Sequence, residues 1–332
     1  MKIALISDAW RPQINGVVTT LTKTSQILQS MGYELETITP DRFRNWPCPS
    51  YPTIRLALGC SPRLEKILDN SQPKIIHIAT EGPLGLAGRR YCIKRNLVFT
   101  TSFHTRFAEY IQVRFGIPLS WGYSYLRWFH RPAKRIMVAT ASLENELKTE
   151  GFRNLVRWSR GVDTSHYHPR KKILLNVPRP VFMYVGRVSV EKNIEAFLKL
   201  SLPGTKLVVG DGPQLEMLRK KHPFARFVGY KTGEALAQYF ASADVFVFPS
   251  ITDTFGLTML EALASGVPVA AYCAQAPRDV LKDKRVGFMD QDLKVAAVKA
   301  LSLDRAACRE YAQKYTWETC THQFIRQLIT VK

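Results

Sequence analysis

Two carboxylates at a fixed spacing mark the segment between residues 249 and 266. Asp253 follows an apolar run at Val245–Phe248, and Glu261 lies eight residues later in a predicted helix, about two turns inward. Asp253 can accept hydrogen bonds from sugar hydroxyls, and Glu261 can accept them from a ribose. A structural, hydrogen-bonded carboxylate is the alternative for Glu261, but in the apolar run 260–264 an unpaired charge is costly. We therefore expect a bound partner.

Two cations and several backbone groups could complete a phosphate site. Arg187 and Lys192 stand five residues apart in the loop after the apolar run at Val181–Val185. They can flank one diphosphate, to which a helix N-terminus adds amide donors. As an isolated pair they would simply be solvated cations, and the glycines alone would be ordinary turns. The other expected contacts are the backbone groups of Gly186, Gly210, Gly212, Tyr230, Phe255, Gly256 and Leu257.

Parallel sheets would position these loops. Short apolar β-rich runs alternate with helical periods along the chain, which predicts βαβ units. The strands are expected at 3–6, 35–39, 75–78, 97–101, 136–138, 181–185, 206–209, 225–228, 245–248 and 267–271. A helix starting near Val17 should end at Gly32, because glycine tolerates the left-handed helix stop. We predict two doubly wound, Rossmann-like α/β domains that bind ligands at the carboxyl ends of their strands.

The chain length also favours two domains. A chain of 332 residues exceeds the roughly 250 residues at which single cores stop growing. The stretch from Ser159 to Pro180 is polar, basic and interrupted by glycine and proline, as expected of a connection between domains. The predicted domains therefore cover residues 1–168 and residues 169–315.

Composition limits the class of protein. Hydrophobic residues make up 46% and charged residues 22% of the chain, as in globular proteins. No apolar run reaches the ~18 residues of a transmembrane helix, and Asp8 interrupts the N-terminal run before a signal-peptide core could form. The six cysteines show neither metal-ligand spacing nor a C-x-x-C pair, so a cytoplasmic location is expected.

The net charge of +20 favours phosphate-bearing partners, and part of the excess is concentrated between Leu84 and Arg135. One acid, Glu109, stands there among Arg89, Arg90, Lys94, Arg95, Arg106, Arg114, Arg127, Arg131, Lys134 and Arg135. Aromatic residues are interleaved with these cations, which predicts contact with an anionic membrane surface. The alternative is a solvated basic face beside a core that contains Phe107, Tyr110, Trp121 and Trp128.

The chemistry-bearing segments resemble glycosyltransferase family four, a large retaining family with the GT-B fold, over essentially the whole chain. Arg187 and Lys192 fall on the family's diphosphate-binding pair, and Gly210–Pro213 on its V-G-D/x-G-P segment. Asp253 and Glu261 fall on its Glu-x7-Glu motif, although Asp253 is one methylene shorter than the first Glu. The form T-D-T-F-G with N-G-V-V resembles the bacterial mannosyl- or lipid-linked branch.

Further segments of the chain carry the same resemblance. Residues 11–18, with Gly16, resemble the glycine-bearing loop over the donor phosphates, although Asn15 stands where many members have glycine. His104 matches the histidine that reaches the donor sugar, and residues 316–332 resemble the C-terminal helix that crosses back to the first domain. The alternative for His104 is a ring packed between Phe103 and Phe107.

The resemblance implies retaining transfer of a hexose of the mannose or glucose type to an acceptor hydroxyl. The donor would be GDP-mannose or a UDP-sugar, and the acceptor a lipid-linked molecule or a glycan at the inner face of the cell membrane. Arg187, Lys192, His104 and Asp253 would be the catalytic residues, with no cofactor, metal or nucleic acid involved. The rival interpretations are a GT-B phosphorylase or epimerase, and a basic nucleic-acid-binding α/β protein.

The sequence predicts transfer that does not depend on a metal ion, because no D-x-D cluster is placed to hold a divalent cation and Arg187 and Lys192 can replace it. EDTA should leave the rate of sugar transfer largely unchanged. Loss of the activity on chelation, and its return with Mg²⁺ or Mn²⁺, would contradict this expectation.

Overall fold

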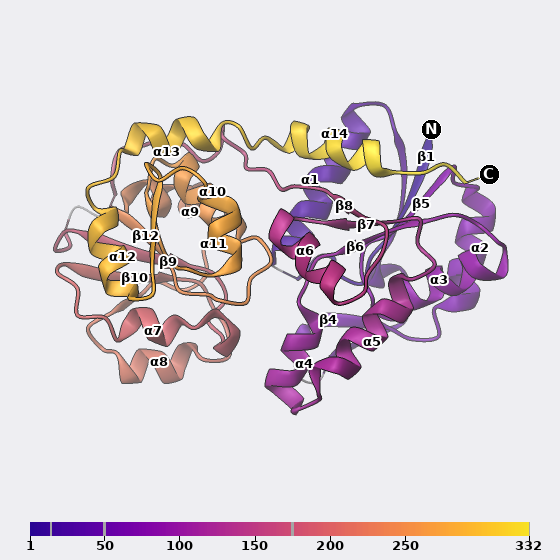
Figure 1. Cartoon of the computed structure of the whole chain (residues 1–332), viewed down its shortest axis with the longest axis horizontal. Helices are drawn as coiled ribbons and strands as arrows, with labels where there is room; N and C mark the ends of the chain where they lie inside the picture. The colour runs from indigo at the N-terminus through magenta and orange to yellow at the C-terminus, as the bar shows by residue number, and fades with distance from the viewer. Residues whose placement is uncertain (14, 49–50, 174–175, 332) are drawn as a thin grey trace. The chain divides into compact units, whose positions relative to one another are not determined.

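The computed structural model describes residues 1–13, 15–48, 51–173 and 176–331, which form two compact α/β units (Figure 1). The first unit comprises Met1–Ser159 together with Trp317–Lys332, and the second comprises Arg160–Thr316. Ile14 of the expected phosphate loop and residues 174–175 of the expected connection lie outside the described residues.

The first unit is built on a parallel sheet with the strand order β2-β1-β5-β6-β7-β8. Its strands are β1 Lys2–Ile6, β2 Glu34–Ile38, β5 Ile75–Ile78, β6 Thr100–Phe103, β7 Arg135–Val138 and β8 Leu155–Arg157. Its helices are α1 Gly16–Ser30, α2 Ser61–Ser71, α3 Pro83–Lys94, α4 Phe107–Phe115, α5 Leu119–His130, α6 Ala141–Thr149 and α14 Trp317–Gln327. A 3-10 turn, η1 Pro40–Arg42, leads into an antiparallel hairpin of β3 Asn45–Cys48 and β4 Tyr51–Ala57.

The second unit repeats this plan with the order β11-β10-β9-β12-β13-β14. Its strands are β9 Val181–Val185, β10 Thr205–Val209, β11 Arg226–Phe227, β12 Val245–Phe248, β13 Val269–Tyr272 and β14 Gly287–Asp290. Its helices are η2 Val190–Lys192, α7 Ile194–Leu198, α8 Leu215–Lys221, α9 Gly233–Ser242, α10 Leu257–Ala264, α11 Gln275–Val280, α12 Leu293–Ala300 and α13 Arg305–Ala312. The predicted fold class, two doubly wound α/β domains, is therefore confirmed.

A buried carboxylate joins β1 to α3 in the first unit. Asp8, directly after β1, accepts hydrogen bonds from the backbone N of Leu84 at 2.8 Å, the backbone N of Gly85 at 3.2 Å and the hydroxyl of Thr80 at 2.9 Å. A Cβ at Gly82 would lie 2.5 Å from the Asp8 carboxyl carbon, so only glycine fits there. Burial raises the pKa of Asp8, and these hydrogen bonds partly oppose the shift.

The C-terminal helix α14 belongs to the first unit, as the resemblance implies. Phe324 places its ring 4.9 Å from the ring of His77, and the backbone N of Val331 donates to the carbonyl of Lys74. His77 is fully buried on β5 and its ring nitrogens lie 2.8 Å from the hydroxyls of Thr100 and Ser102. Burial lowers the pKa of His77 to about 3, so the ring is neutral and structural.

Element boundaries differ from the expectations at a few places. β6 occupies 100–103 instead of 97–101, β13 occupies 269–272 instead of 267–271, and the β3–β4 hairpin, β8 and β14 were not predicted. The first unit ends at Ser159 and not at residue 168. Arg309 on α13 donates to the carbonyls of Thr164 and Tyr167, which holds the intervening residues on the second unit.

Candidate active site

The loops after β9, β10 and β11 are joined backbone to backbone in the second unit. Gly186 N donates to the carbonyl of Val209 at 3.0 Å, and Gly210 N donates to the carbonyl of Gly229 at 2.9 Å. A Cβ at Gly210 would lie 1.8 Å from the carbonyl oxygen of Gly186. This close approach admits only glycine at position 210, so its role is first of all to bring the strand ends together.

Gly212 continues the contact between the loops after β9 and β10. Val188 N donates to the carbonyl of Asp211 at 2.9 Å, and a Cβ at Gly212 would lie 2.4 Å from the carbonyl oxygen of Val188. The Asp211 carboxylate accepts a hydrogen bond from Gly212 N at 2.6 Å. These contacts with the loop after β10 hold the loop that carries Arg187 in place.

The structure pairs both predicted cations with carboxylates. Lys192 Nζ contacts Asp253 Oδ1, and these side chains are only 23% and 12% exposed. Arg187 forms an ion pair with Glu191 Oε1 at 3.5 Å. Lys192 and Asp253 come from different segments of the chain and meet in one charged cluster at the carboxyl ends of the strands. Glu191, which pairs with Arg187, was not among the residues predicted for the site.

Hydrogen bonds tie the Asp253 loop to η2, which carries Lys192. Thr252 Oγ1 donates to the carbonyl of Glu191 at 3.2 Å, and Asn193 Nδ2 donates to the carbonyl of Pro249 at 3.2 Å. Both bonds run from a side chain to a carbonyl and join the loops after β9 and β12, so they help to hold Lys192 and Asp253 next to each other. The Asp253 carboxylate can accept hydrogen bonds from sugar hydroxyls, and the Lys192 ammonium can bind an anion.

A glycine with a left-handed backbone directly precedes α10. Gly256 has φ +81°, and a Cβ there would lie 2.8 Å from the Phe248 ring and from the Met259 methyl carbon. Phe255 is buried and Leu257, the first helical residue, is partly buried. The helix N-terminus that follows can donate amides to an anion.

Glu261, on α10, forms a hydrogen bond with Tyr167. Burial raises the pKa of the Glu261 carboxyl to about 7, and the hydrogen bond from Tyr167 partly opposes this shift. The same carboxylate, together with burial, raises the pKa of Tyr167. Sequence reasoning missed Tyr167 because it lies in the stretch interpreted as an interdomain connection. Tyr230 is 43% exposed, as an accessible base contact requires.

In the first unit, His104 follows β6 and is 6% exposed. Its ring lies 5.5 Å from that of Trp158, edge to face. Of the two phenylalanines in the alternative interpretation, Phe103 packs against Phe152, and Phe107 is 43% exposed.

Gly16 is the first residue of α1, whose N-cap is Asn15. The Asn15 side chain accepts hydrogen bonds from Val17 N and Val18 N at 3.0 Å each. Asn15, which stands where many members of the family have glycine, therefore already binds two of the free N–H groups at the start of α1. Among the described residues, no three His, Cys, Asp or Glu side chains group to hold a metal ion.

Two family models together match most of the chain. The model described as Glycosyltransferase Family 4 matches residues 14–166, and the model described as Glycosyl transferases group 1 matches residues 179–303. The second match contains Arg187, Lys192, Asp253 and Glu261.

Curated relatives carry transferase names. The chain is 30% identical to the GDP-mannose-dependent alpha-mannosyltransferase of Mycolicibacterium smegmatis, over 87% of this chain and 84% of that protein. It is 31% identical to the sulfoquinovosyl transferase SQD2 of Arabidopsis thaliana, over 89% of this chain and 66% of that protein. It is 26% identical to the alpha-monoglucosyldiacylglycerol synthase of Streptococcus pneumoniae, over 91% of this chain and 78% of that protein.

Solved structures share the fold. The chain superposes on the sucrose-phosphate synthase of Thermosynechococcus elongatus with a TM-score of 0.79 at 20% identity, covering 98% of this chain and 97% of the other. It superposes on Anabaena HepE, solved with UDP and glucose, with a TM-score of 0.74 at 15% identity and 98% coverage of both chains.

The raised pKa of Glu261 predicts a pH-dependent stability. The proton that the folded state retains stabilises it below about pH 4.5, and this contribution is lost as the pH rises through about 7. Replacement of Glu261 by Gln should therefore stabilise the protein by roughly 1–3 kcal/mol above pH 7 and have little effect below pH 4.5. Urea unfolding across this range measures the effect, with Glu310→Gln on the exposed side of α13 as the control. A difference that stays constant with pH would contradict the assignment.

Proposed function

The chain belongs to glycosyltransferase family 4 and has the GT-B fold, and on that premise we propose that it transfers a hexose from a nucleotide-diphosphate sugar to an acceptor hydroxyl. The observation that carries the proposal is the charged cluster of Lys192, Asp253, Arg187 and Glu191 at the carboxyl edge of the second sheet. It offers cations for a diphosphate beside a carboxylate for a sugar, and the α10 N-terminus follows Asp253 in the same loop.

The proposed reaction needs no covalent enzyme intermediate. The bond between the anomeric carbon and the diphosphate oxygen breaks, and the acceptor oxygen bonds to the same face of that carbon, with retention. A donor phosphate oxygen takes the acceptor proton. Arg187 and Lys192 stabilise the negative charge that develops on the departing diphosphate, which replaces a metal ion in this role.

Carboxylates position the donor in this scheme. Asp253 accepts hydrogen bonds from the sugar hydroxyls, and its contact with Lys192 fixes its orientation. Glu261 accepts a hydrogen bond from a ribose hydroxyl, and its hydrogen bond with Tyr167 holds the carboxyl in place. By resemblance to the family, His104 of the first unit would orient the sugar, and Gly16, at the start of α1, would contribute to binding the donor phosphates. GDP-mannose is the favoured donor because the mycobacterial relative is named for it, with a UDP-sugar as the alternative.

The proposed acceptor is a lipid-linked molecule or a glycan at the inner face of the cell membrane. The alpha-monoglucosyldiacylglycerol synthase among the relatives supports a lipid acceptor. Within the described residues, no helix is both long and apolar enough to span a bilayer. We propose that binding to such an acceptor uses a surface of the folded protein.

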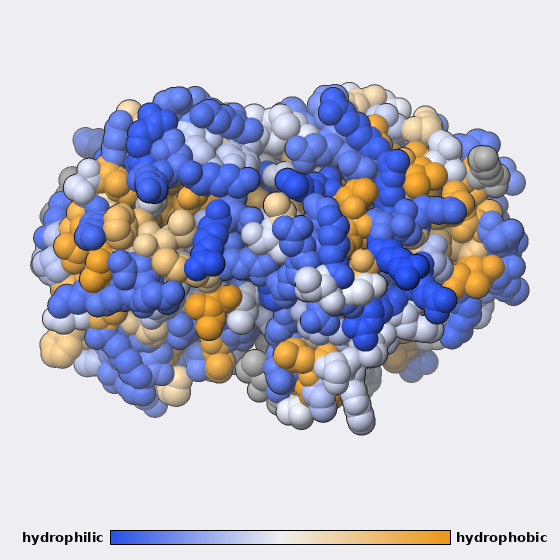
Figure 2. Space-filling view, viewed as in Figure 1, coloured by the Kyte–Doolittle hydropathy of each residue, from blue (hydrophilic) through white to orange (hydrophobic). Residues whose placement is uncertain are grey.

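α4 and α5 provide an exposed aromatic surface for this purpose. Trp121 is 71% exposed, Trp128 49% and Phe107 43%, so these three do not pack in the core, whereas Tyr110 is partly buried. Figure 2 shows apolar side chains among hydrophilic ones over this part of the first unit. Aromatic rings flanked by cations suit the headgroup level of a membrane.

Several nearby cations have structural partners and do not count toward this surface. Arg106 is 11% exposed and forms ion pairs with Glu109 and Glu146. Arg89 stacks on Trp128, with its guanidinium carbon 3.9 Å from the ring centroid, and donates to the carbonyl of Phe129. Arg131 and Lys134 are exposed and remain the best candidates for lipid contact.

Arg187→Ala should lower the rate of transfer by about 10²–10³ and leave the fold intact, because it removes charge from the leaving group and not from a core. Lys192→Ala should have a similar effect on the rate. Lys199→Ala, which removes an exposed lysine paired with Glu195 in the same unit, is the matched control and should transfer at the wild-type rate. Donor turnover with a panel of nucleotide sugars measures the effect; near-wild-type rates in both site variants would rule out this mechanism.

Vesicle co-sedimentation tests the proposed membrane surface. Binding should require anionic lipid and weaken with salt, because screening shortens electrostatic reach to ~10 Å at 0.1 M. The Arg131→Gln/Lys134→Gln variant should bind about tenfold more weakly or worse, at about 1 kcal/mol for each cation. Lys282→Gln/Lys284→Gln, two exposed lysines of the second unit, is the matched control. Equal binding to neutral vesicles, or no binding at all, would refute the proposal.

A further inference from the structure

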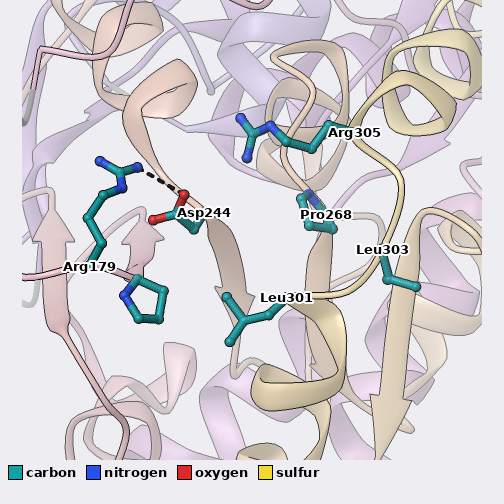
Figure 3. A pocket seen from close by; sticks show the side chains of 7 residues that line it. Arg179, Asp244, Pro268, Leu301, Leu303 and Arg305 are labelled. Atoms are coloured by element: carbon teal, nitrogen blue, oxygen red, sulfur yellow. Dashed lines mark hydrogen bonds and ion pairs between the residues drawn. The ribbon is translucent and has the colours of Figure 1, made fainter.

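A cavity of about 410 Å³ lies at the opposite edge of the second sheet (Figure 3). Pro180, Asp244 and Pro268 line it and stand directly before β9, β12 and β13, whereas the candidate active site follows the carboxyl ends of these strands. A five-residue strand such as β9 spans about 17 Å, so the cavity is separate from the donor site.

More cations than anions surround the cavity. The guanidinium groups of Arg179 and Arg305 lie on either side of Asp244 in Figure 3. Arg179 donates to Asp244 Oδ1 at 2.9 Å, and Lys172 Nζ lies 2.8 Å from the same oxygen. Arg179 and Arg305 line the cavity, and Lys172 contacts Asp244 beside it, so the three cations exceed the one carboxylate by two charges.

Asp244 is already committed to other donors. Its Oδ2 accepts a hydrogen bond from Val181 N at 2.8 Å, and its Oδ1 serves Arg179 and Lys172. Among the described residues, the five N–H groups of Arg305 make one hydrogen bond, to the carbonyl of Ala243 at 3.1 Å. Burial lowers the pKa of Arg305 and Arg179 adds to this effect, whereas the negative charge of Asp244 opposes it.

The rest of the lining is apolar. Leu301 and Leu303 lie beside Pro180 and Pro268, and proline nitrogens carry no hydrogen to satisfy. We propose that this cavity binds a phosphate ester, whose oxygens pair with Arg179 and Arg305 while its carbon chain rests on the leucines. An excess of two charges matches a phosphate monoester better than a carboxylate, and guanidinium groups bind phosphate oxygens two at a time.

Titration calorimetry with inorganic phosphate and with hexyl phosphate tests the site. The protein carries Arg187→Ala and Lys192→Ala, so that the donor site does not compete for the phosphate. Hexyl phosphate should bind about tenfold or more tightly than inorganic phosphate, because part of its chain leaves water. Arg305→Gln should weaken both ligands about tenfold or more, and Leu301→Ser should weaken hexyl phosphate alone.

Two further variants separate a lost contact from a disturbed fold. Leu301→Glu keeps Arg305 and adds a negative charge at a residue that is 38% exposed, so it should abolish binding without unfolding the unit. Arg226→Gln, an exposed arginine on β11, is the matched control and should bind normally. Absence of saturable hexyl phosphate binding, or binding that both Arg305→Gln and Leu301→Glu leave unchanged, would overturn the proposal.

Vesicles containing phosphatidic acid identify the source of the phosphate ester. If vesicle binding falls in Arg305→Gln, the ligand is a lipid headgroup. If hexyl phosphate binding depends on Arg305 and vesicle binding does not, the ligand is a soluble phosphate ester; either result supports the site. Because donor turnover is measured with Arg187 and Lys192 intact, failure of this proposal leaves the proposed transfer reaction unaffected.

Discussion

The close approach of the backbone at Gly186 and Gly210 is the constraint on which the candidate active site depends. The carbonyl oxygen of Gly186 occupies the place where a side chain at position 210 would begin. A second close contact, between Val188 and Gly212, also packs the loops after β9 and β10 against each other. The hydrogen bond from Gly210 N to the carbonyl of Gly229 adds the loop after β11. The packing of these three loops thereby fixes the backbone that carries the proposed diphosphate site.

Charge balance is the second feature that shapes the site. Each cation of the proposed diphosphate pair already has a carboxylate neighbour, Asp253 for Lys192 and Glu191 for Arg187. The cluster is therefore close to neutral before a donor arrives, and its cations are held in place by these neighbours. Burial raises the pKa of Glu261 to about 7, so its carboxyl is partly protonated near neutral pH and carries less than a full negative charge. In the proposed reaction, a diphosphate would therefore meet oriented cations with limited repulsion from the acids.

Most of the fold, and the position of the loops proposed to bind the donor, could be predicted from local patterns, because buried parallel strands give uninterrupted apolar runs such as Val181–Val185 and Val245–Phe248. Short or partly exposed strands, such as those of the β3–β4 hairpin, give no such signal. The contact between Lys192 and Asp253 and the bond between Tyr167 and Glu261 join residues far apart in sequence, and a pattern within one segment does not encode them. The first unit ends earlier than predicted for the same reason: Arg309, far along the chain, forms hydrogen bonds with the carbonyls of Thr164 and Tyr167 and holds the connecting residues on the second unit.

The return of α14 to the first unit has a consequence for synthesis on the ribosome. The chain completes β1 to β8 early, but Phe324 and Val331 reach His77 and Lys74 only after the whole second unit has been made. Until then, the face of the first sheet that carries the His77 ring lacks part of its cover, and such exposed apolar surface is prone to aggregation. The second unit is thus an insertion within the first, and residues translated after it complete the first core.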